Sequence, residues 1–189
     1  MAQNKLILIG GMPASGKTTV GKQLASKLSL PFLDKDTLCD LYTNYVVGKE
    51  TYSNDRASSL YTKTLRPLEY EILFHVAFEQ VELGLSPVLV APFSTEFVNN
   101  DMMDSLKLRL FKKNPSFQLV SILIEADPES VKERMTKRGR NEDSKKLENW
   151  DSYILDKILF QKKAKSIVDF SVNAEDKELL SKLLKIVLT

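Results

Sequence analysis

The sequence predicts an α/β fold in which a parallel sheet is covered by helices on both faces. Short β-branched, apolar runs alternate with longer helical patterns along the whole chain, an alternation that is typical of βαβ units. The 189 residues, of which 43% are apolar, are enough for one well-buried core and favour one domain over two. We therefore expect a single domain that spans residues 1–189.

Apolar runs and helical patterns give the expected elements in order. The strands are expected at residues 6–9, 31–33, 87–91, 118–124 and 167–172. The helices are expected at residues 18–28, 37–47, 60–83, 96–112, 129–138, 150–165 and 176–187. Two polar stretches, residues 48–59 and 139–148, are interpreted as mobile insertions on this one domain, and both can be lids.

Residues 11–18 match the pattern G-x-x-x-x-G-K-[ST] at every fixed position, between the first expected strand and helix. Glycines let the backbone approach a polyphosphate, so that amide N–H groups and the positive helix end converge on its oxygens. The lysine adds a charge near the β- and γ-phosphates, and the hydroxyl after it can coordinate Mg²⁺. The predicted nucleotide-binding residues here are Gly11, Pro13, Ala14, Ser15, Gly16, Lys17, Thr18 and Thr19.

Two carboxylates, Asp34 and Asp36, follow the second expected strand. In an open α/β sheet the ligand lies beyond the carboxyl ends of the strands, where residues such as these are found. A carboxylate at this edge can hold a water of Mg²⁺ or accept the proton of an attacking hydroxyl. The alternative is structural: Asp36 caps the helix that begins at Thr37, and Asp34 is solvated.

Composition restricts the partners and the compartment. A net charge of +2 gives no electrostatic reason to expect nucleic acid. Cys39 is the single cysteine, which excludes an intrachain disulfide and favours a reducing compartment. The chain shows neither a signal-peptide pattern nor an apolar run of membrane-spanning length. We expect a cytoplasmic protein that does not interact with membranes, as a monomer or homodimer.

Taken together, five segments resemble small P-loop kinases of the shikimate kinase and gluconate kinase kind. They are residues 11–18, 32–36, 66–70, 88–94 and 134–153. The chain is most similar to ATP-binding kinases that also resemble chloramphenicol phosphotransferase and zeta-toxin domains. The resemblance implies a three-layer αβα sandwich whose five-stranded parallel sheet has the order 2-3-1-4-5, with ATP and Mg²⁺ as cofactors. It also implies an acceptor-side insertion over about residues 48–70 and a mobile lid over about residues 134–148.

The resemblance also implies roles for individual residues. Asp34 would help Thr18 to hold Mg²⁺, and Asp36 would orient the acceptor hydroxyl and take its proton. Arg134 would lie against adenine, and Arg138 would reach the transferring phosphate from the lid. The other implied contacts are those of Asn173 with adenine and of Arg66 with the acceptor, with Arg56 and Tyr61 as weaker acceptor-side candidates.

The chain departs from the family pattern at two positions. Ala91 stands where related kinases often have an aspartate after the third strand, which leaves Asp34 as the metal carboxylate. Glu142 stands where many have a second lid arginine. Either Arg140 substitutes for that arginine, or the second lid arginine is absent and Arg140 belongs to a solvated basic helix end.

Other conspicuous residues have structural interpretations. Asp127 is suited to cap a helix whose first residue is Pro128. His75, the only histidine, lies in an apolar helix without a Ser, Cys or metal-ligand cluster, so we interpret it as packed or partly exposed rather than as a base. The aromatic pair Trp150 and Tyr153 recurs at helical spacing and is interpreted as core.

The function that these observations favour is transfer of the ATP γ-phosphate to a hydroxyl of a small molecule. A nucleoside, nucleotide or antibiotic acceptor is an alternative within the same class. A nucleotide-dependent switch or NTPase that acts on a protein partner is an alternative of another class, but it would not require the Asp34/Asp36 pair.

Overall fold

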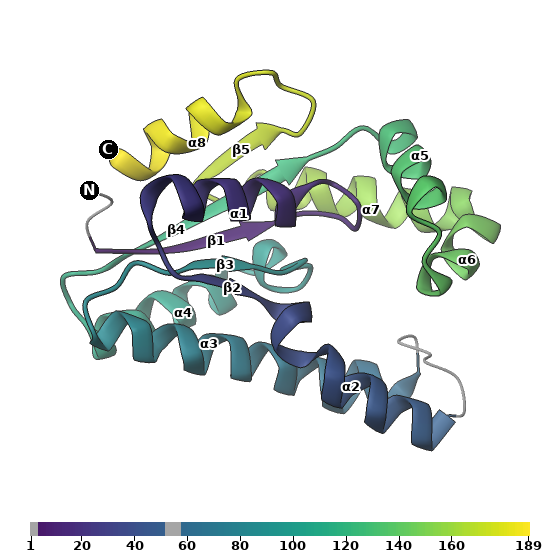
Figure 1. Cartoon of the computed structure of the whole chain (residues 1–189), viewed down its shortest axis with the longest axis horizontal. Coiled ribbons are helices and arrows are strands. Elements are labelled where there is room, and N and C mark those ends of the chain that lie inside the picture. The colour runs from purple at the N-terminus through teal and green to yellow at the C-terminus, as the bar shows by residue number, and fades with distance from the viewer. Residues whose placement is uncertain (1–3, 52–57) are drawn as a thin grey trace.

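The computed structural model describes residues 4–51 and 58–189, and its centre is one five-stranded parallel sheet (Figure 1). The strand order is β2-β3-β1-β4-β5, and every pairing is parallel. The strands are β1 (Lys5–Gly10), β2 (Phe32–Asp34), β3 (Val88–Val90), β4 (Gln118–Glu125) and β5 (Phe170–Asn173). The expected α/β class and strand order are confirmed.

Helices cover both faces of the sheet (Figure 1). The α-helices are α1 (Lys17–Leu28), α2 (Lys35–Thr51), α3 (Arg66–Glu82), α4 (Asn100–Lys113), α5 (Pro128–Arg138), α6 (Asn141–Glu148), α7 (Trp150–Ala164) and α8 (Leu179–Leu188). A π-helical turn, η1 (Tyr61–Leu65), precedes α3, and a 3₁₀ turn, η2 (Glu96–Val98), precedes α4. None of the helices in the described part of the chain has the length and hydrophobicity that crossing a bilayer requires.

The two faces of β1 belong to two separate cores. Ile7 and Ile9 pack with residues of α1 and α8, whereas Leu6 and Leu8 pack with residues of α3, α4 and α7. All four side chains are completely buried, as expected for the central strand of a parallel sheet. The strand is therefore a fixed support for the phosphate-binding loop that follows it.

The start of α2 shows which of the two aspartates caps this helix. The helix begins at Lys35, and Asp34 Oδ1 accepts the backbone N–H groups of Asp36 (2.9 Å) and Thr37 (3.1 Å). Asp34 is thus the capping carboxylate and is buried, not solvated. The interpretation of Asp36 as a helix cap is wrong: it lies inside the first turn, and its side chain is half-exposed.

Two helical segments also differ from the sequence pattern. The expected helix over residues 96–112 is interrupted at Asn99, whose side chain accepts the Met102 N–H at 3.2 Å and so caps α4. The polar stretch 139–148 contains α6, although it lacks an apolar stripe. Gly139, with φ of 57°, ends α5, and the pair between Asp143 and Lys146 supports α6 at i,i+3 spacing.

The residues with structural interpretations lie largely where the sequence predicts. Asp127 Oδ2 accepts the N–H groups of Glu129 and Ser130, and Pro128 begins α5. The Trp150 and Tyr153 rings pack with centroids 5.8 Å apart. His75 differs from its interpretation as packed or partly exposed: its side chain is 80% exposed, with Nε2 3.6 Å from Glu79 Oε1. The central part of the expected insertion, residues 52–57 with Arg56, lies outside the described residues.

Gly21 allows α1 to approach the sheet closely. A Cβ atom on it would lie 2.6 Å from Val90 Cγ2 and 3.2 Å from the Phe32 ring. Because valine at position 90 is stiff, Gly21→Val is expected to lower the free energy of unfolding by about 2 kcal/mol. Urea denaturation measures this, with Ser26→Val on the exposed face of α1 as the control for helix propensity. Equal losses in the two variants would contradict the packing argument.

Candidate active site

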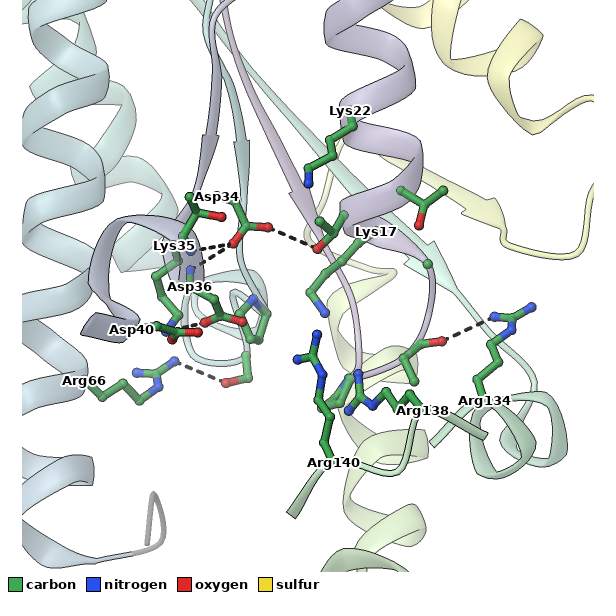
Figure 2. A pocket seen from close by; sticks show the side chains of 18 of the residues that line it. Lys17, Lys22, Asp34, Lys35, Asp36, Asp40, Arg66, Arg134, Arg138 and Arg140 are labelled. Atoms are coloured by element: carbon green, nitrogen blue, oxygen red, sulfur yellow. Dashed lines mark hydrogen bonds and ion pairs between the residues drawn. The ribbon is translucent and has the colours of Figure 1, made fainter. Parts of the chain in front are cut away.

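The loop between β1 and α1 turns its backbone toward the carboxyl edge of the sheet (Figure 2). Gly11 has φ of 151°, and a Cβ there would lie 2.6 Å from the Ile124 carbonyl oxygen. Gly16, with φ of 90°, precedes α1, and no side chain caps the helix there. The first amides of α1 therefore remain available to an anion, as the loop pattern predicts.

A cleft of about 870 Å³ opens above this loop. It contains most of the predicted site residues, from four parts of the chain: Pro13, Ala14, Gly16, Lys17, Thr18, Thr19, Asp34, Asp36, Arg66, Arg134 and Arg138. Gly11 and Ser15 are buried behind the loop surface. Asn173 is exposed at the end of β5, outside this lining, and its Oδ1 accepts the Glu175 N–H at 2.8 Å.

Lys17 extends from the first turn of α1 into the cleft. Its ammonium group donates to the Met12 carbonyl oxygen at 3.2 Å. Burial lowers the pKa of Lys17 to about 8, although Asp36 and Asp34 oppose the shift. A polyphosphate bound here would supply the anionic partner that favours the charged form.

Thr18 and Asp34 together form an oxygen-rich corner of the cleft. The Thr18 hydroxyl donates to Asp34 Oδ2 at 3.1 Å, while the other carboxylate oxygen is held by the cap of α2. Mg²⁺ in nucleotide sites is usually held by one or two protein oxygens together with phosphates and waters. The pair fits that role, and the described residues contain no cluster of three or more His, Cys, Asp or Glu side chains that would hold a metal unaided.

Arg138 is fixed by a buried carboxylate. Its Nε and Nη2 donate to the two oxygens of Asp143 at 2.5 and 2.8 Å, and Lys146 lies 3.1 Å from the same carboxylate. Burial alone would raise the pKa of Asp143, but Arg138 and Lys146 hold it below its ordinary value. The stabilisation is therefore present above about pH 4 and is lost only as the pH falls through that lowered pKa.

Arg134 and Arg138 reach the cleft from the same helix. Arg134 donates to the Ala14 carbonyl oxygen at 3.4 Å and pairs with Glu175 at 3.1 Å. Figure 2 shows both arginines and Arg140 on the side of the cleft away from Asp34 and Asp36. Arg140 also lines the cleft, which places it beside the two arginines of α5.

Arg66 begins α3 on the opposite side of the cleft. It donates to Ser94 Oγ at 3.2 Å and lies 3.8 Å from Glu96, and its guanidinium stacks 4.6 Å from the centre of the Tyr70 ring. Burial raises the pKa of Glu96. These contacts hold the guanidinium in one place at the edge of the cleft.

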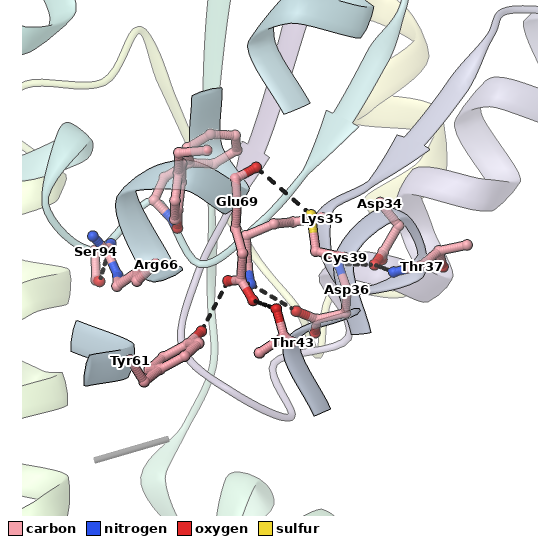
Figure 3. Close-up of polar contacts among 12 residues, drawn as sticks. Asp34, Lys35, Asp36, Thr37, Cys39, Thr43, Tyr61, Arg66, Glu69 and Ser94 are labelled. Atoms are coloured by element: carbon pink, nitrogen blue, oxygen red, sulfur yellow. Dashed lines mark hydrogen bonds and ion pairs between the residues drawn. The ribbon is translucent and has the colours of Figure 1, made fainter. Parts of the chain in front are cut away.

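The structure adds residues that the sequence interpretation did not select. Lys35, between the two aspartates, turns inward and pairs with the buried Glu69 of α3 (Figure 3). Burial alone would lower the pKa of Lys35, but Asp36, Tyr61 and Glu69 hold it above its ordinary value. A signal for Glu69 existed: it lies four residues from both Leu65 and Leu73, on an otherwise apolar, buried helical stripe.

Basic side chains outnumber acidic ones in the cleft lining. The basic ones are Lys17, Lys22, Lys35, Arg66, Arg134, Arg138, Arg140 and Lys146. The acidic ones are Asp34, Asp36 and Asp40. The cleft is therefore suited to ligands that carry several negative charges.

Three solved structures of similar fold and low sequence identity bear the names of kinases. A provisionally assigned kinase from Chloroflexus aurantiacus is 19% identical, with a TM-score of 0.63, and the alignment covers 98% of this chain and 97% of that one. The shikimate kinase of Acinetobacter baumannii, in complex with shikimate, is 15% identical, with a TM-score of 0.58 and coverage of 98% and 93%. A gluconokinase from Sinorhizobium meliloti is 16% identical, with a TM-score of 0.50 and coverage of 98% and 90%.

No curated protein sequence matches this chain significantly. A family model described as an AAA domain matches residues 6–155, which include the phosphate-binding loop, the acidic pair, both arginines of α5 and the whole of α6. The structural likeness agrees with the expected kinase-like fold, and the family implies nucleotide binding. Because the family model spans most of the sequence, the chain belongs to this AAA domain family of P-loop proteins.

Proposed function

We propose that this protein is an ATP- and Mg²⁺-dependent phosphotransferase that moves the γ-phosphate to a hydroxyl group of a small molecule. One observation carries the proposal: the half-exposed carboxylate of Asp36 opens into the same cleft as Lys17 and the amides of the loop. A protein that only senses a bound nucleotide does not need a carboxylate there. A phosphotransferase needs one to orient an acceptor.

The nucleotide would lie with its phosphates on the loop. Amides of residues 14–18 and Lys17 would hold the β- and γ-phosphates, and Arg134 would lie near the base. Thr18 and Asp34 would hold Mg²⁺, which when bound neutralises part of the phosphate charge. We assign catalysis mainly to positioning and to charge neutralisation, as in other phosphoryl transfers.

The transfer exchanges one P–O bond for another. The acceptor oxygen forms a bond to the γ-phosphorus while the bond to the β-phosphate bridging oxygen breaks, so that ADP leaves. Asp36 accepts the proton of the acceptor hydroxyl. Lys17 and Arg138 stabilise the charge on the transferring group and on the leaving ADP.

The excess of basic side chains favours an acceptor that carries a carboxylate or phosphate in addition to its hydroxyl. Mg·ATP is itself anionic, yet Arg66, Arg140 and Lys146 lie beyond the loop and can bind further negative charge. The shikimate in the Acinetobacter structure is one such small molecule, bound by a protein of similar fold. We also propose that residues 134–148 close over the bound ligands as a lid and that residues 48–70 contribute to the acceptor side.

The test is ADP release from Mg·ATP in the presence of a panel of hydroxy acids, sugar acids, phosphorylated alcohols and nucleosides. At least one compound is expected to stimulate release. Asp36→Asn is expected to lower the stimulated rate about 100-fold, because the amide cannot accept the proton. Its Kd for Mg·ATP should stay within about twofold of the wild-type value, since Asp34 and Thr18 remain.

Three outcomes would count against this assignment. Full transfer activity in Asp36→Asn would exclude its role as the base. If every compound leaves the rate unchanged while a protein partner stimulates hydrolysis, the nucleotide-dependent switch becomes the better description. Loss of Mg·ATP binding in Asp36→Asn would place this carboxylate among the metal ligands instead.

A further inference from the structure

A buried polar cluster lies beside the acidic pair, where α2, η1 and α3 meet (Figure 3). Its centre is Glu69, which is completely buried. Glu69 Oε2 accepts from Lys35 Nζ at 2.5 Å and from the Tyr61 hydroxyl at 2.9 Å, and Oε1 accepts from the Thr43 hydroxyl at 2.7 Å. We call these four residues the Glu69 cluster.

Burying the two charges of this cluster costs free energy, because both must be removed from water. Lys35 is only 3% exposed and Glu69 is fully enclosed, so both charges have lost their hydration. Buried ion pairs of this kind are often no more stabilising than apolar side chains of similar volume. Stability alone therefore does not account for a lysine at position 35.

Lys35 also contacts the carboxylate in the cleft. Its Nζ lies 3.0 Å from Asp36 Oδ1, while the Asp36 side chain is 50% exposed. The backbone N–H of Asp36 is meanwhile held by Asp34. Asp36 is thus anchored at its backbone by Asp34 and at its carboxylate by Lys35, and Lys35 is in turn anchored by Glu69.

We propose that Lys35 is a positioning residue that holds the Asp36 carboxylate in the orientation needed to receive the acceptor hydroxyl, and that Glu69, Tyr61 and Thr43 hold Lys35 in place. This inference rests on the proposed function. An exposed aspartate at a helix start would otherwise sample several rotamers. Fixing it before the acceptor arrives removes an ordering cost from the reaction, so its loss should slow the reaction about tenfold.

The cluster also connects the base to the acceptor side of the cleft. Tyr61 belongs to η1, and Glu69 lies one helical turn after Arg66 at the start of α3. A movement of η1 or α3 would reach Asp36 through Glu69 and Lys35. The same contacts that build the acceptor side therefore set the position of the carboxylate.

The experiment separates positioning from folding by comparing Lys35→Met with the double variant Lys35→Met/Glu69→Gln. The readouts are the thermal midpoint, the Kd for Mg·ATP and the single-turnover rate of Mg·ATP hydrolysis, in which water is the acceptor. Lys35→Met leaves Glu69 buried without its cation, so the thermal midpoint should fall. The double variant removes both charges, so the midpoint should return toward that of the wild type.

The positioning role of Lys35 predicts that the rate of hydrolysis, unlike the thermal midpoint, is not restored in the double variant. Hydrolysis should be about tenfold slower in both variants, with the Kd for Mg·ATP within about twofold of wild type, because neither variant restores the contact to Asp36. The control is Lys113→Met/Glu82→Gln, which removes an exposed Lys–Glu pair between α4 and α3 at 2.8 Å and should change neither the rate nor the Kd.

Asp36→Asn, measured in parallel, separates the role of Asp36 as the base from the role of Lys35 in positioning it. If Asp36→Asn slows hydrolysis but the stable double variant hydrolyses at the wild-type rate, the positioning role is wrong and the base survives. If Asp36→Asn leaves the rate of hydrolysis unchanged, both the role of Asp36 as the base and the positioning role of Lys35 are wrong.

If the double variant does not fold, Glu69→Gln alone tests the inference. A rate of hydrolysis several-fold below that of the wild type, at an unchanged Kd for Mg·ATP, supports the inference, and a wild-type rate overturns it.

Discussion

Replacement of Lys17 by methionine is expected to weaken Mg·ATP binding at least 100-fold, or about 3 kcal/mol, and to abolish phosphoryl transfer. The reason is geometric as well as electrostatic. Lys17 projects from the first turn of α1 into a partly enclosed cleft, where charge-assisted hydrogen bonds to phosphate are stronger than in water. Methionine matches the lysine side chain in length as far as Cε and lacks the ammonium group, which donates to the Met12 carbonyl oxygen.

Isothermal titration with Mg·ADP and Mg·ATP measures this effect. Lys27→Met is the matched control, because Lys27 lies on the exposed face of the same helix, in its last turn. We expect the control to bind as the wild type does. Retention of binding within a fewfold in Lys17→Met would mean that the phosphates do not lie against this lysine.

Replacement of Arg138 by methionine is expected to lower the rate of transfer about 1,000-fold with little effect on Mg·ATP affinity. A guanidinium that reaches the transferring group acts mainly in the transition state, where it neutralises developing charge. The variant should still fold, because Asp143 keeps its contact with Lys146 at 3.1 Å. Loss of the bidentate pair between Arg138 and Asp143 should loosen only the connection between α5 and α6.

Single-turnover transfer from Mg·ATP at a saturating acceptor concentration measures the rate of phosphoryl transfer separately from binding. The control is Lys137→Met, which removes the neighbouring exposed cation on α5 and should leave the rate unchanged. A rate within tenfold of wild type in Arg138→Met would exclude a transition-state role. It would leave this arginine as a structural partner of Asp143.

The central part of the fold follows directly from the sequence. The apolar run of β1 and the G-x-x-x-x-G-K-[ST] pattern are local signals, and the structure places them as one strand, loop and helix. Element boundaries were less predictable where a side chain makes a nonlocal or capping contact. Asn99 divides the helix expected over 96–112, and α6 is stabilised by ion pairs at Asp143 rather than by an apolar stripe.

In the candidate site, too, local features could be predicted from the sequence and nonlocal contacts could not. The spacing of Asp34 and Asp36 identified the correct edge of the sheet, but it could not show which carboxylate caps α2, since both lie near its start. The helical stripe marks Glu69 as buried, but its pairing with Lys35 could not be predicted from the sequence. Lys35 and Glu69 are 34 positions apart, and only the packing of α3 against α2 brings their charges together.

Transfer of the labelled γ-phosphate from Mg·ATP tests the central claim most directly, with the anionic hydroxy compounds of the panel as acceptors. We expect the label to appear as a phosphate ester with at least one acceptor in the wild type, and at about 1% of that rate in Asp36→Asn. If the wild type binds Mg·ATP but releases label only as inorganic phosphate with every compound, the protein is not the phosphotransferase that we propose.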